Sequence, residues 1–422
     1  MANSLIDKNL FDNLNEEEKK YVLEILHEYE KTGESKIFNE LLYDDYKEIP
    51  VDIVTFITDD RYLGQAWKDA EGKLKLYPFW MEKLKELFPN SFDTVVNNLI
   101  ESGARGLGKS EIAVTVCLYI MYRVMCLKDP LEFFHIKKTE KLCFAFMNLT
   151  LDLSKDVAVS KFQSTVQLSP WFMQRGTMTQ RDNSPYWIPP DYIEIIIGSQ
   201  SSHLIGKPVL FAFFDEISFI KNQDIDKQKA IAMDMIDTAI GGMKTRFIYN
   251  GKNYSFLILA SSKRSEKSFL ETHMKKKLKS EKENVMIIDE PVWNVKPPET
   301  YCGERFNVAL GNKFLVSQVI DNNTDPKIFI DRGYKIISVP VEFRAEFIDD
   351  IDRALCDFAG ISSSELTKYI SGQALTDTIN ENLKNPFTKS IIEVGNDPND
   401  KAQYYDYFDL SKVPSNLKWK PL

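Results

Sequence analysis

The residues best suited to chemistry are the eight that read GARGLGKS, from Gly103 to Ser110. They fit the pattern GxxxxGK[ST], in which glycines let backbone N–H groups turn toward phosphate oxygens and the next helix adds its dipole. We expect Lys109 to contact the β- and γ-phosphates of a bound nucleotide and Ser110 to ligate Mg²⁺ through its hydroxyl. The expected nucleotide-binding residues of this loop are Gly103, Ala104, Arg105, Gly106, Leu107, Gly108, Lys109 and Ser110. The alternative is a glycine loop without function, but a strand pattern precedes the loop and a strong helix pattern follows it.

Two adjacent carboxylates, Asp215 and Glu216, close the apolar run that begins at Val209. A parallel strand would expose both at the carboxyl edge of a sheet, beside the phosphate loop. Asp215 is then expected to hold the magnesium ion, and Glu216 to orient and deprotonate the attacking water as catalytic base. Taken alone, such a pair is more often a turn or a helix cap. Beside a phosphate loop it favours hydrolysis of ATP over phosphate transfer, because a kinase needs no glutamate to polarise water.

A second strand pattern, Phe256–Ala260, ends in the hydroxyl residues Ser261 and Ser262. Hydroxyl groups at a strand end near the γ-phosphate can gain or lose a hydrogen bond when ATP is hydrolysed. They are therefore candidates for coupling hydrolysis to movement. A plain strand-to-turn transition is the alternative.

Two aromatic residues and two arginines are also considered for the nucleotide site. The aromatic pair Tyr77 and Phe79 precedes the first core strand and can pack on adenine, although packing onto the protein core explains it equally well. Arg105, inside the loop, is expected to stabilise charge that develops on the γ-phosphate, and Arg264 is the alternative for that role.

Short apolar runs alternate with helical stretches through the middle of the chain, a pattern typical of a parallel sheet with crossover helices. The helix after the phosphate loop, SEIAVTVCLYIMYRVMC, is apolar on nearly every side and should be buried. The sequence thus predicts an α/β P-loop fold with a mostly parallel central sheet flanked by helices. The predicted strands of that sheet are Thr94–Ile100, Leu142–Met147, Ile193–Ile197, Val209–Phe214 and Phe256–Ala260.

Four segments are predicted along the chain: an N-terminal helical segment over 1–75, a P-loop ATPase core over 76–282, a small lid subdomain over 283–380 and a linker over 381–422. An amphipathic helix is expected within the first segment, at residues 14–31. The third segment is expected to hold short strands at Val285–Ile288 and Lys335–Phe343, and a helical stretch at Phe347–Phe358. The aspartates of that stretch are expected to cap a helix and to face solvent.

Composition narrows the class of protein. The chain has 422 residues, 43% of them hydrophobic, which is ample for a large core. Its formal charge of −9 gives no general attraction to nucleic acid, so any DNA contact must be local. No leader peptide and no apolar stretch of about 18 residues is found. Five scattered cysteines indicate buried thiols in a reducing compartment and make zinc binding improbable.

Together these motifs resemble the large terminase subunit of tailed bacteriophages, a motor that pumps viral DNA into a capsid. The resemblance rests on GARGLGKS, on the apolar strand ending in Asp215 and Glu216, and on LILASS at 257–262, with similar flanking text in FITDDRYLG and SSHLIGKPVLFAFFDE. It spans about residues 50–265 and is weaker to about residue 360. It implies an ASCE/RecA-like ATPase with a lid, using ATP and Mg²⁺, in the cytoplasm of an infected bacterial host.

The same resemblance implies partners. These are double-stranded DNA held through phosphates, a portal protein, a small terminase subunit and further copies in a homo-oligomeric ring, with no membrane. Lys137-Lys138 and Lys275–Lys277 are candidates for the DNA contact, although charged runs are usually solvated faces.

The chain departs from that family in two respects. No acidic cluster of an RNase H-like nuclease domain is found, so nuclease activity is not expected and residues 381–422 are interpreted as a linker toward such a domain. Trp80 stands near the position where a polar residue that reads adenine is expected.

Two other functions remain open. One is a nucleic-acid helicase or remodelling ATPase, for which too little chain follows residue 282 to form a second RecA-like core. The other is a non-hydrolysing nucleotide-binding scaffold, which would not need Glu216.

Overall fold

The structure is a computed structural model that describes residues 15–16, 19–20, 22–24, 27, 44–148, 159–181, 184–216, 225–249, 251–263, 284–311, 315–321 and 323–362. The chain divides into two compact units, one formed by Met1–Asn307 with Ser338–Ser363 and the other by Val308–Ile337 with Ser364–Leu422. The predicted N-terminal helix lies mostly outside the described residues. The predicted linker 381–422 lies wholly outside them.

Six strands in the first unit form the central sheet, in the order β10-β1-β9-β6-β2-β5. Every neighbouring pair in it is parallel. One strand, β9, thus separates the strand before the phosphate loop from the strand that carries the acid pair, as in the ASCE/RecA-like class. The bounds are β1 (Asn98–Glu101), β2 (Leu142–Asn148), β5 (Ile193–Gly198), β6 (Val209–Asp215), β9 (Phe256–Ala260) and β10 (Val285–Ile288).

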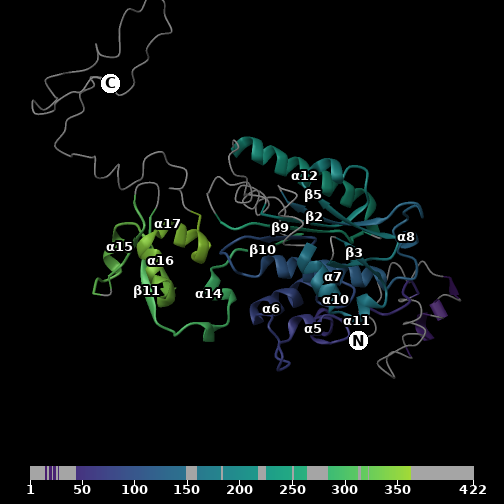
Figure 1. Ribbon diagram of the computed structural model, residues 1–422, viewed down its shortest axis with the longest axis horizontal. Coiled ribbons are helices and arrows are strands. Elements are labelled where there is room, and N and C mark those ends of the chain that lie inside the picture. The colour runs from purple at the N-terminus through teal and green to yellow at the C-terminus, as the bar shows by residue number, and fades with distance from the viewer. Residues whose placement is uncertain are drawn as a thin grey trace, which may run out of the picture. The chain divides into compact units, whose positions relative to one another are not determined.

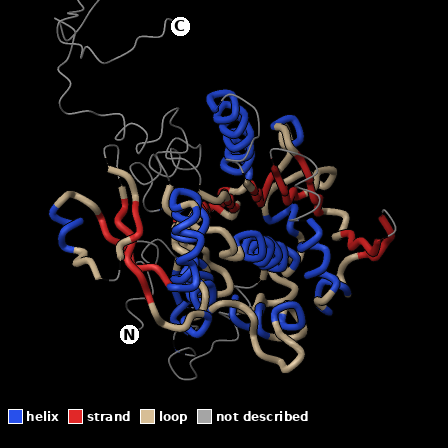
Figure 2. The backbone as a smooth tube through the Cα atoms, turned by 60° about the vertical axis from the view of Figure 1, so that its left-hand side comes forward, coloured by secondary structure: helices blue, strands red, loops and turns tan. Residues whose placement is uncertain are grey.

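Helices cover both faces of this sheet. On one face lies α7 (Lys109–Met125), almost entirely buried as its all-round apolar sequence predicts, and on the other lies α12 (Ile225–Arg246). Figure 1 shows α12 and α7 on opposite sides of the strands, and the view of Figure 2 agrees. Strand residues alternate between the layers: Phe211 and Phe213 of β6 pack in the cluster around α7, and Ala212 packs in the cluster around α12.

The region before the phosphate loop belongs to the same core. Asp52 caps α4 (Ile53–Thr58) by accepting hydrogen bonds from the backbone N–H groups of Val54 and Thr55. Phe56 of this helix is fully buried, and its ring centroid lies 4.9 Å from that of Tyr122 on α7. Helix α4, within the segment predicted as 1–75, therefore packs directly on the phosphate-loop helix.

Shorter elements complete the first unit. A π-helical turn, η7, ends the described chain of this unit close to residue 360. The bounds are α5 (Gly64–Trp67), α6 (Pro78–Leu87), α8 (Pro130–Phe133), α10 (Ser160–Gln167), α11 (Pro170–Met173), β3 (Thr177–Arg181), β4 (Ser184–Ile188), η3 (Ser201–His203), β7 (Ile248–Tyr249), β8 (Lys252–Asn253), α14 (Val292–Val295), η5 (Pro298–Thr300), η6 (Val341–Phe343), α16 (Arg344–Asp349), α17 (Ile351–Ala354) and η7 (Leu355–Ala359).

The second unit is small. Its described part holds β12 (Gln318–Val319) and α15 (Lys327–Asp331). It also holds the ends of β11 (Arg305–Leu310) and β13 (Lys335–Pro340) that fall within 308–337. Here β11 pairs antiparallel with β12, with Val308 opposite Val319.

The structure corrects three sequence predictions. Val285–Ile288, placed in the lid subdomain, is instead β10 of the central sheet and pairs with β1, so the sheet extends beyond residue 282. The first strand begins at Asn98 rather than at Thr94, because the backbone N–H of Val95 donates to the carbonyl oxygen of Leu87 at the end of α6 instead of to a strand. The helical stretch 347–358 is broken at Asp350, which has extended backbone and caps α17.

The packing of Phe56 on α7 can be tested by mutation. Phe56→Ala should lower the free energy of unfolding by about 3–5 kcal/mol, because it leaves a cavity among buried aromatic rings. The matched control is Ile205→Ala at a side chain with 67% of its surface exposed, which should cost less than about 0.5 kcal/mol. Urea unfolding curves measure both. Equal effects from the two variants would contradict the packing described.

Candidate nucleotide site

The phosphate loop lies between the end of β1 and the start of α7. Gly103 has a φ of 87°, and a Cβ atom there would lie 2.6 Å from the carbonyl oxygen of Glu290, so only glycine fits. Gly108, with a φ of 88°, is the residue before the first turn of α7. The N-terminal N–H groups of α7 are thereby left to a ligand, which is the usual way that helices bind phosphate.

Trp80 supports the loop backbone instead of reading a base. Its side chain is buried, and its indole N–H donates to the carbonyl oxygen of Leu107 at 2.6 Å. The family resemblance predicts a residue that binds adenine near this position. Trp80 instead holds the loop backbone through its hydrogen bond to Leu107. Tyr77 and Phe79, the two aromatic residues expected at adenine, are half-buried at the start of the same helix, α6, and pack against the core.

Arg105 is held by the segment near residue 357. Its Nε lies 2.9 Å from Oδ1 of Asp357, and its backbone N–H donates to the Asp357 carbonyl oxygen at 2.8 Å. Gly360, three residues later, lies against the backbone of Gly103 and Ala104. Sequence reasoning placed the aspartates of this stretch on a solvated face. Asp357 is instead only 14% exposed and pairs with the loop arginine.

The structure brings together the lysine, the loop serine and the first carboxylate of the acid pair. Lys109 is 8% exposed, and its Nζ donates to the carbonyl oxygen of Ala104 at 3.0 Å. The Ser110 hydroxyl donates to Oδ2 of Asp215 at 3.3 Å. Two adjacent hard oxygen ligands suit Mg²⁺, which takes few protein ligands and keeps several waters. Ser110 and Asp215 therefore fit the expected metal.

The second carboxylate of the pair touches both candidate coupling serines. The Ser262 hydroxyl donates to Oε1 of Glu216 at 3.3 Å, and the Ser261 hydroxyl approaches Oε2 at 3.5 Å. Glu216 also has a φ of 49°, a left-handed conformation that is uncommon for a residue with a side chain. Such strain is typical of functional positions.

Burial and neighbouring charges shift the pKa values of the site. Burial raises the pKa of Asp215 to about 6, and the adjacent Glu216 charge adds to the shift. Burial lowers the pKa of Lys109, while the charges of Glu216, Glu101, Asp215 and Asp289 oppose that change. Several carboxylates thus surround Lys109, and a divalent cation would relieve their mutual repulsion.

Sequence reasoning missed Glu101, the last residue of β1. It is fully buried, and neither carboxylate oxygen has a hydrogen-bond partner among the described residues. Burial raises its pKa well above the ordinary value, with Lys109 and Asp215 as its charged neighbours. The available signal was an acidic residue directly after an apolar strand pattern and two positions before Gly103.

An ion pair made by a buried lysine was also missed. Nζ of Lys263 lies 2.8 Å from Oδ2 of Asp289, just past the ends of β9 and β10. The signal for Lys263 was its place directly after the two serines. Asp289 gave none, because β10 was not expected in this sheet.

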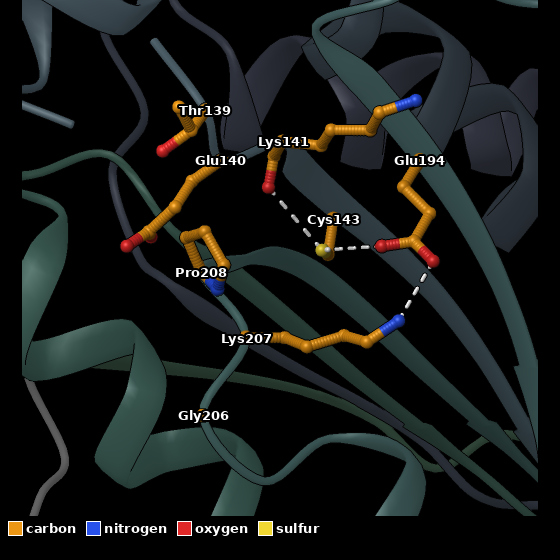
Figure 3. A pocket seen from close by; sticks show the side chains of 8 residues that line it. All are labelled: Thr139, Glu140, Lys141, Cys143, Glu194, Gly206, Lys207 and Pro208. Carbon is orange, nitrogen blue, oxygen red and sulfur yellow. Dashed lines mark hydrogen bonds and ion pairs between the residues drawn. The ribbon is translucent and has the colours of Figure 1, made fainter. Parts of the chain in front are cut away.

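A hollow of about 450 Å³ lies at the opposite edge of the sheet, near the start of β2 (Figure 3). Its Lys207 pairs with Glu194 at 2.7 Å. The Cys143 thiol contacts the same glutamate, and burial raises its pKa to about 12, which makes it a poor nucleophile. The lining residues are Thr139, Glu140, Lys141, Cys143, Glu194, Gly206, Lys207 and Pro208.

The remaining expectations concern lysines, an arginine and the cysteines outside these motifs. Lys137 and Lys138 are exposed, and Nζ of Lys138 lies 3.7 Å from Asp129, while Lys275–Lys277 and Arg264 fall outside the described residues. Four of the cysteines are buried as expected, but Cys302 is exposed. Among the described helices, none combines the length and apolar character needed to cross a bilayer.

The sheet order and the loop define a P-loop NTPase fold of the ASCE/RecA-like class. Residues 11–307 match the family model described as "Uncharacterized protein MJ0330, N-terminal P-loop domain". This is well over half of the chain, which therefore belongs to that family. No curated protein matches it.

Several solved structures are similar at low identity. The large terminase of the HK97 bacteriophage is 15% identical over 57% of this chain and 43% of that chain, with a TM-score of 0.35. The large terminase of a thermophilic bacteriophage is 10% identical over 50% and 45%, with a TM-score of 0.32. The ATPase domain of the Thermus phage P74-26 large terminase is 13% identical over 43% and 70%, with a TM-score of 0.23. The chain spans less than half of the first two. The family match and the sheet order, not these overall likenesses, define the fold.

The raised pKa of Asp215 predicts a dependence of stability on pH in the absence of metal and nucleotide. The unfolded carboxyl group ionises near its ordinary pKa of 3.8 and the folded one near 6, so the folded state holds the extra proton between them. Stability from this group is complete below about pH 4 and is lost as the pH rises through 6, by about 3 kcal/mol. Asp215→Asn should remove that loss. Urea unfolding of both proteins in EDTA across pH 4–7 measures it, and parallel pH profiles would refute it.

Proposed function

We propose that this protein hydrolyses ATP with Mg²⁺ and uses the energy to move double-stranded DNA, as the ATPase part of a packaging motor of the terminase type. The observation that carries the proposal is the contact between Glu216 and the two serines at the end of β9. This contact connects Glu216, which is suited to activate water, with Ser261 and Ser262, whose hydrogen bonds can change when the γ-phosphate leaves.

The chain's own residues divide the work of hydrolysis. Lys109 and the first turn of α7 bind the phosphates, and Ser110 with Asp215 holds the cation, which when bound neutralises charge on the phosphate oxygens. Glu216 accepts a proton from the attacking water. Its backbone is left-handed, and its carboxylate contacts the two serines that follow β9.

The contact with Ser261 and Ser262 provides a route from chemistry to movement. When the γ-phosphate leaves, the hydrogen bonds around Glu216 and Lys109 must rearrange, and Ser262 Oγ lies 3.4 Å from Lys109 Nζ and 3.3 Å from Glu216. Ser262, which follows β9, thus contacts both Lys109 and Glu216.

The choice of DNA as the moved substrate rests on the motif resemblance described above. By that resemblance the partners are double-stranded DNA, a portal protein, a small terminase subunit and further copies in a ring. Exposed Lys137 and Lys138 are the described candidates for phosphate contact. A helicase sharing this site is the second candidate, and a nucleotide-holding scaffold is the third.

The role of Glu216 can be tested by ATP turnover. Glu216→Gln should lower the rate by about 10²- to 10⁴-fold, because the amide cannot accept the water's proton, while ATP binding persists. The matched control is Glu132→Gln on the exposed surface of α8, which should leave turnover unchanged. Undiminished turnover in the Glu216 variant would remove this residue as the base, and absence of turnover in the unmodified protein would favour the scaffold.

The DNA substrate can be tested in the same assay. Linear double-stranded DNA should raise turnover more than single-stranded DNA of the same length, without separating the strands and without cutting a plasmid in manganese. Strand separation would favour the helicase. Cutting would show a nuclease site that sequence and structure did not reveal.

A further inference from the structure

The ion pair between the buried Lys263 and Asp289 is not explained by the roles assigned so far. The Lys263 side chain is only 5% exposed, and its partner is 33% exposed. Burying a lysine removes the solvation of its charge, and a well-packed apolar pair would join two strand ends at least as well. We therefore expect an ion pair at this position, beside the phosphate loop, to have a function that depends on its charge.

The pair lies directly against the first residues of the phosphate loop. The backbone N–H of Lys263 donates to the carbonyl oxygen of Gly103 at 3.3 Å. Glu290, the neighbour of Asp289, accepts from the N–H of Ala104 at 3.0 Å. Asp289 is also among the carboxylates whose charge acts on Lys109. The backbone of Lys263 is thus held against the start of the loop, and Asp289, the partner of its ammonium, lies close enough to act on the charge of Lys109.

Lys263 lies next to the residues that are expected to respond when the γ-phosphate leaves. It follows Ser261 and Ser262, which contact the base Glu216. A lysine side chain has four flexible carbons, so its ammonium can leave one oxygen partner for another without movement of the backbone. An incoming triphosphate offers phosphate oxygens that compete with the carboxylate of Asp289.

We propose that Lys263 is a second phosphate-binding lysine, which contacts the terminal phosphate of bound ATP and is held by Asp289 when that phosphate is absent. The inference rests on the proposed ATP site. This contact makes the site selective for a triphosphate over a diphosphate. The charge that distinguishes the two, the ammonium of Lys263, belongs to the residue directly after Ser261 and Ser262.

The test compares the affinities for two nucleotides, ATPγS and ADP, each with Mg²⁺, measured by isothermal titration calorimetry. Lys263→Met should weaken ATPγS binding by about 10-fold or more, the worth of one charge-assisted hydrogen bond, and leave ADP binding within about twofold. Lys263→Arg should restore part of the preference for ATPγS, since it keeps the charge. Equal weakening for both nucleotides, or no weakening, would overturn the proposal.

A second variant separates phosphate binding from bracing of the loop, and it serves also if Lys263→Met does not fold. Asp289→Asn keeps the lysine and removes the competing carboxylate, so the preference for ATPγS over ADP should stay or increase. A fall in both affinities would identify the pair as a structural brace and overturn the proposal. If the unmodified protein binds neither nucleotide, the ATP site itself is refuted. If it binds both and Lys263→Met changes nothing, only the lysine's role is refuted.

Discussion

The backbone of the phosphate loop is held by hydrogen bonds from four separate parts of the chain. The N–H of Ala104 is bound from the end of β10, the carbonyl of Gly103 from the end of β9, the N–H of Arg105 from η7 and the carbonyl of Leu107 from Trp80. A loop with three left-handed glycines has many conformations in isolation, so this support determines its shape. A loop fixed in advance can direct N–H groups at phosphate without reorganising when the ligand arrives.

The parallel sheet makes that support possible. Because every pair of neighbouring strands is parallel, the carboxyl ends of β10, β1, β9 and β6 meet at one edge and bring together residues far apart in sequence. Glu101 lies beside Ala260 and Ile288 in the strand register, one residue before the loop region begins. Lysine, serines and carboxylates thus share one small, buried volume, where charge has stronger effects than in water.

The parts of this arrangement that depend on local pattern were predictable. Apolar runs identified all six strands of the central sheet within a few residues, although Val285–Ile288 was assigned to the lid, and the spacing of glycines, lysine and serine identified the loop. The contacts made between distant segments were not predictable. The pairing of β10 with β1 depends on a match across nearly two hundred residues, and the run VMII carries no mark of its partner.

The same limit explains the individual residues that were misjudged. An aspartate in a helical stretch, such as Asp357, looks solvated until tertiary structure brings Arg105 to it. Trp80 looks like an apolar or base-stacking residue until its indole N–H meets the carbonyl of Leu107. Lys263 looks like an ordinary charge after a strand until β10 places Asp289 beside it. In each case the partner, rather than the residue, determines the role.

The central claim, that the carboxyl edge of the sheet binds a nucleotide ready for attack by water, is tested most directly by a crystal structure with Mg²⁺ and a non-hydrolysable ATP analogue. The account predicts phosphates on the loop and the first turn of α7, the metal on Ser110 and Asp215, and the Glu216 carboxylate facing a water beside the terminal phosphate. A nucleotide bound elsewhere, or one bound in the loop with Glu216 turned away from the terminal phosphate, would contradict it.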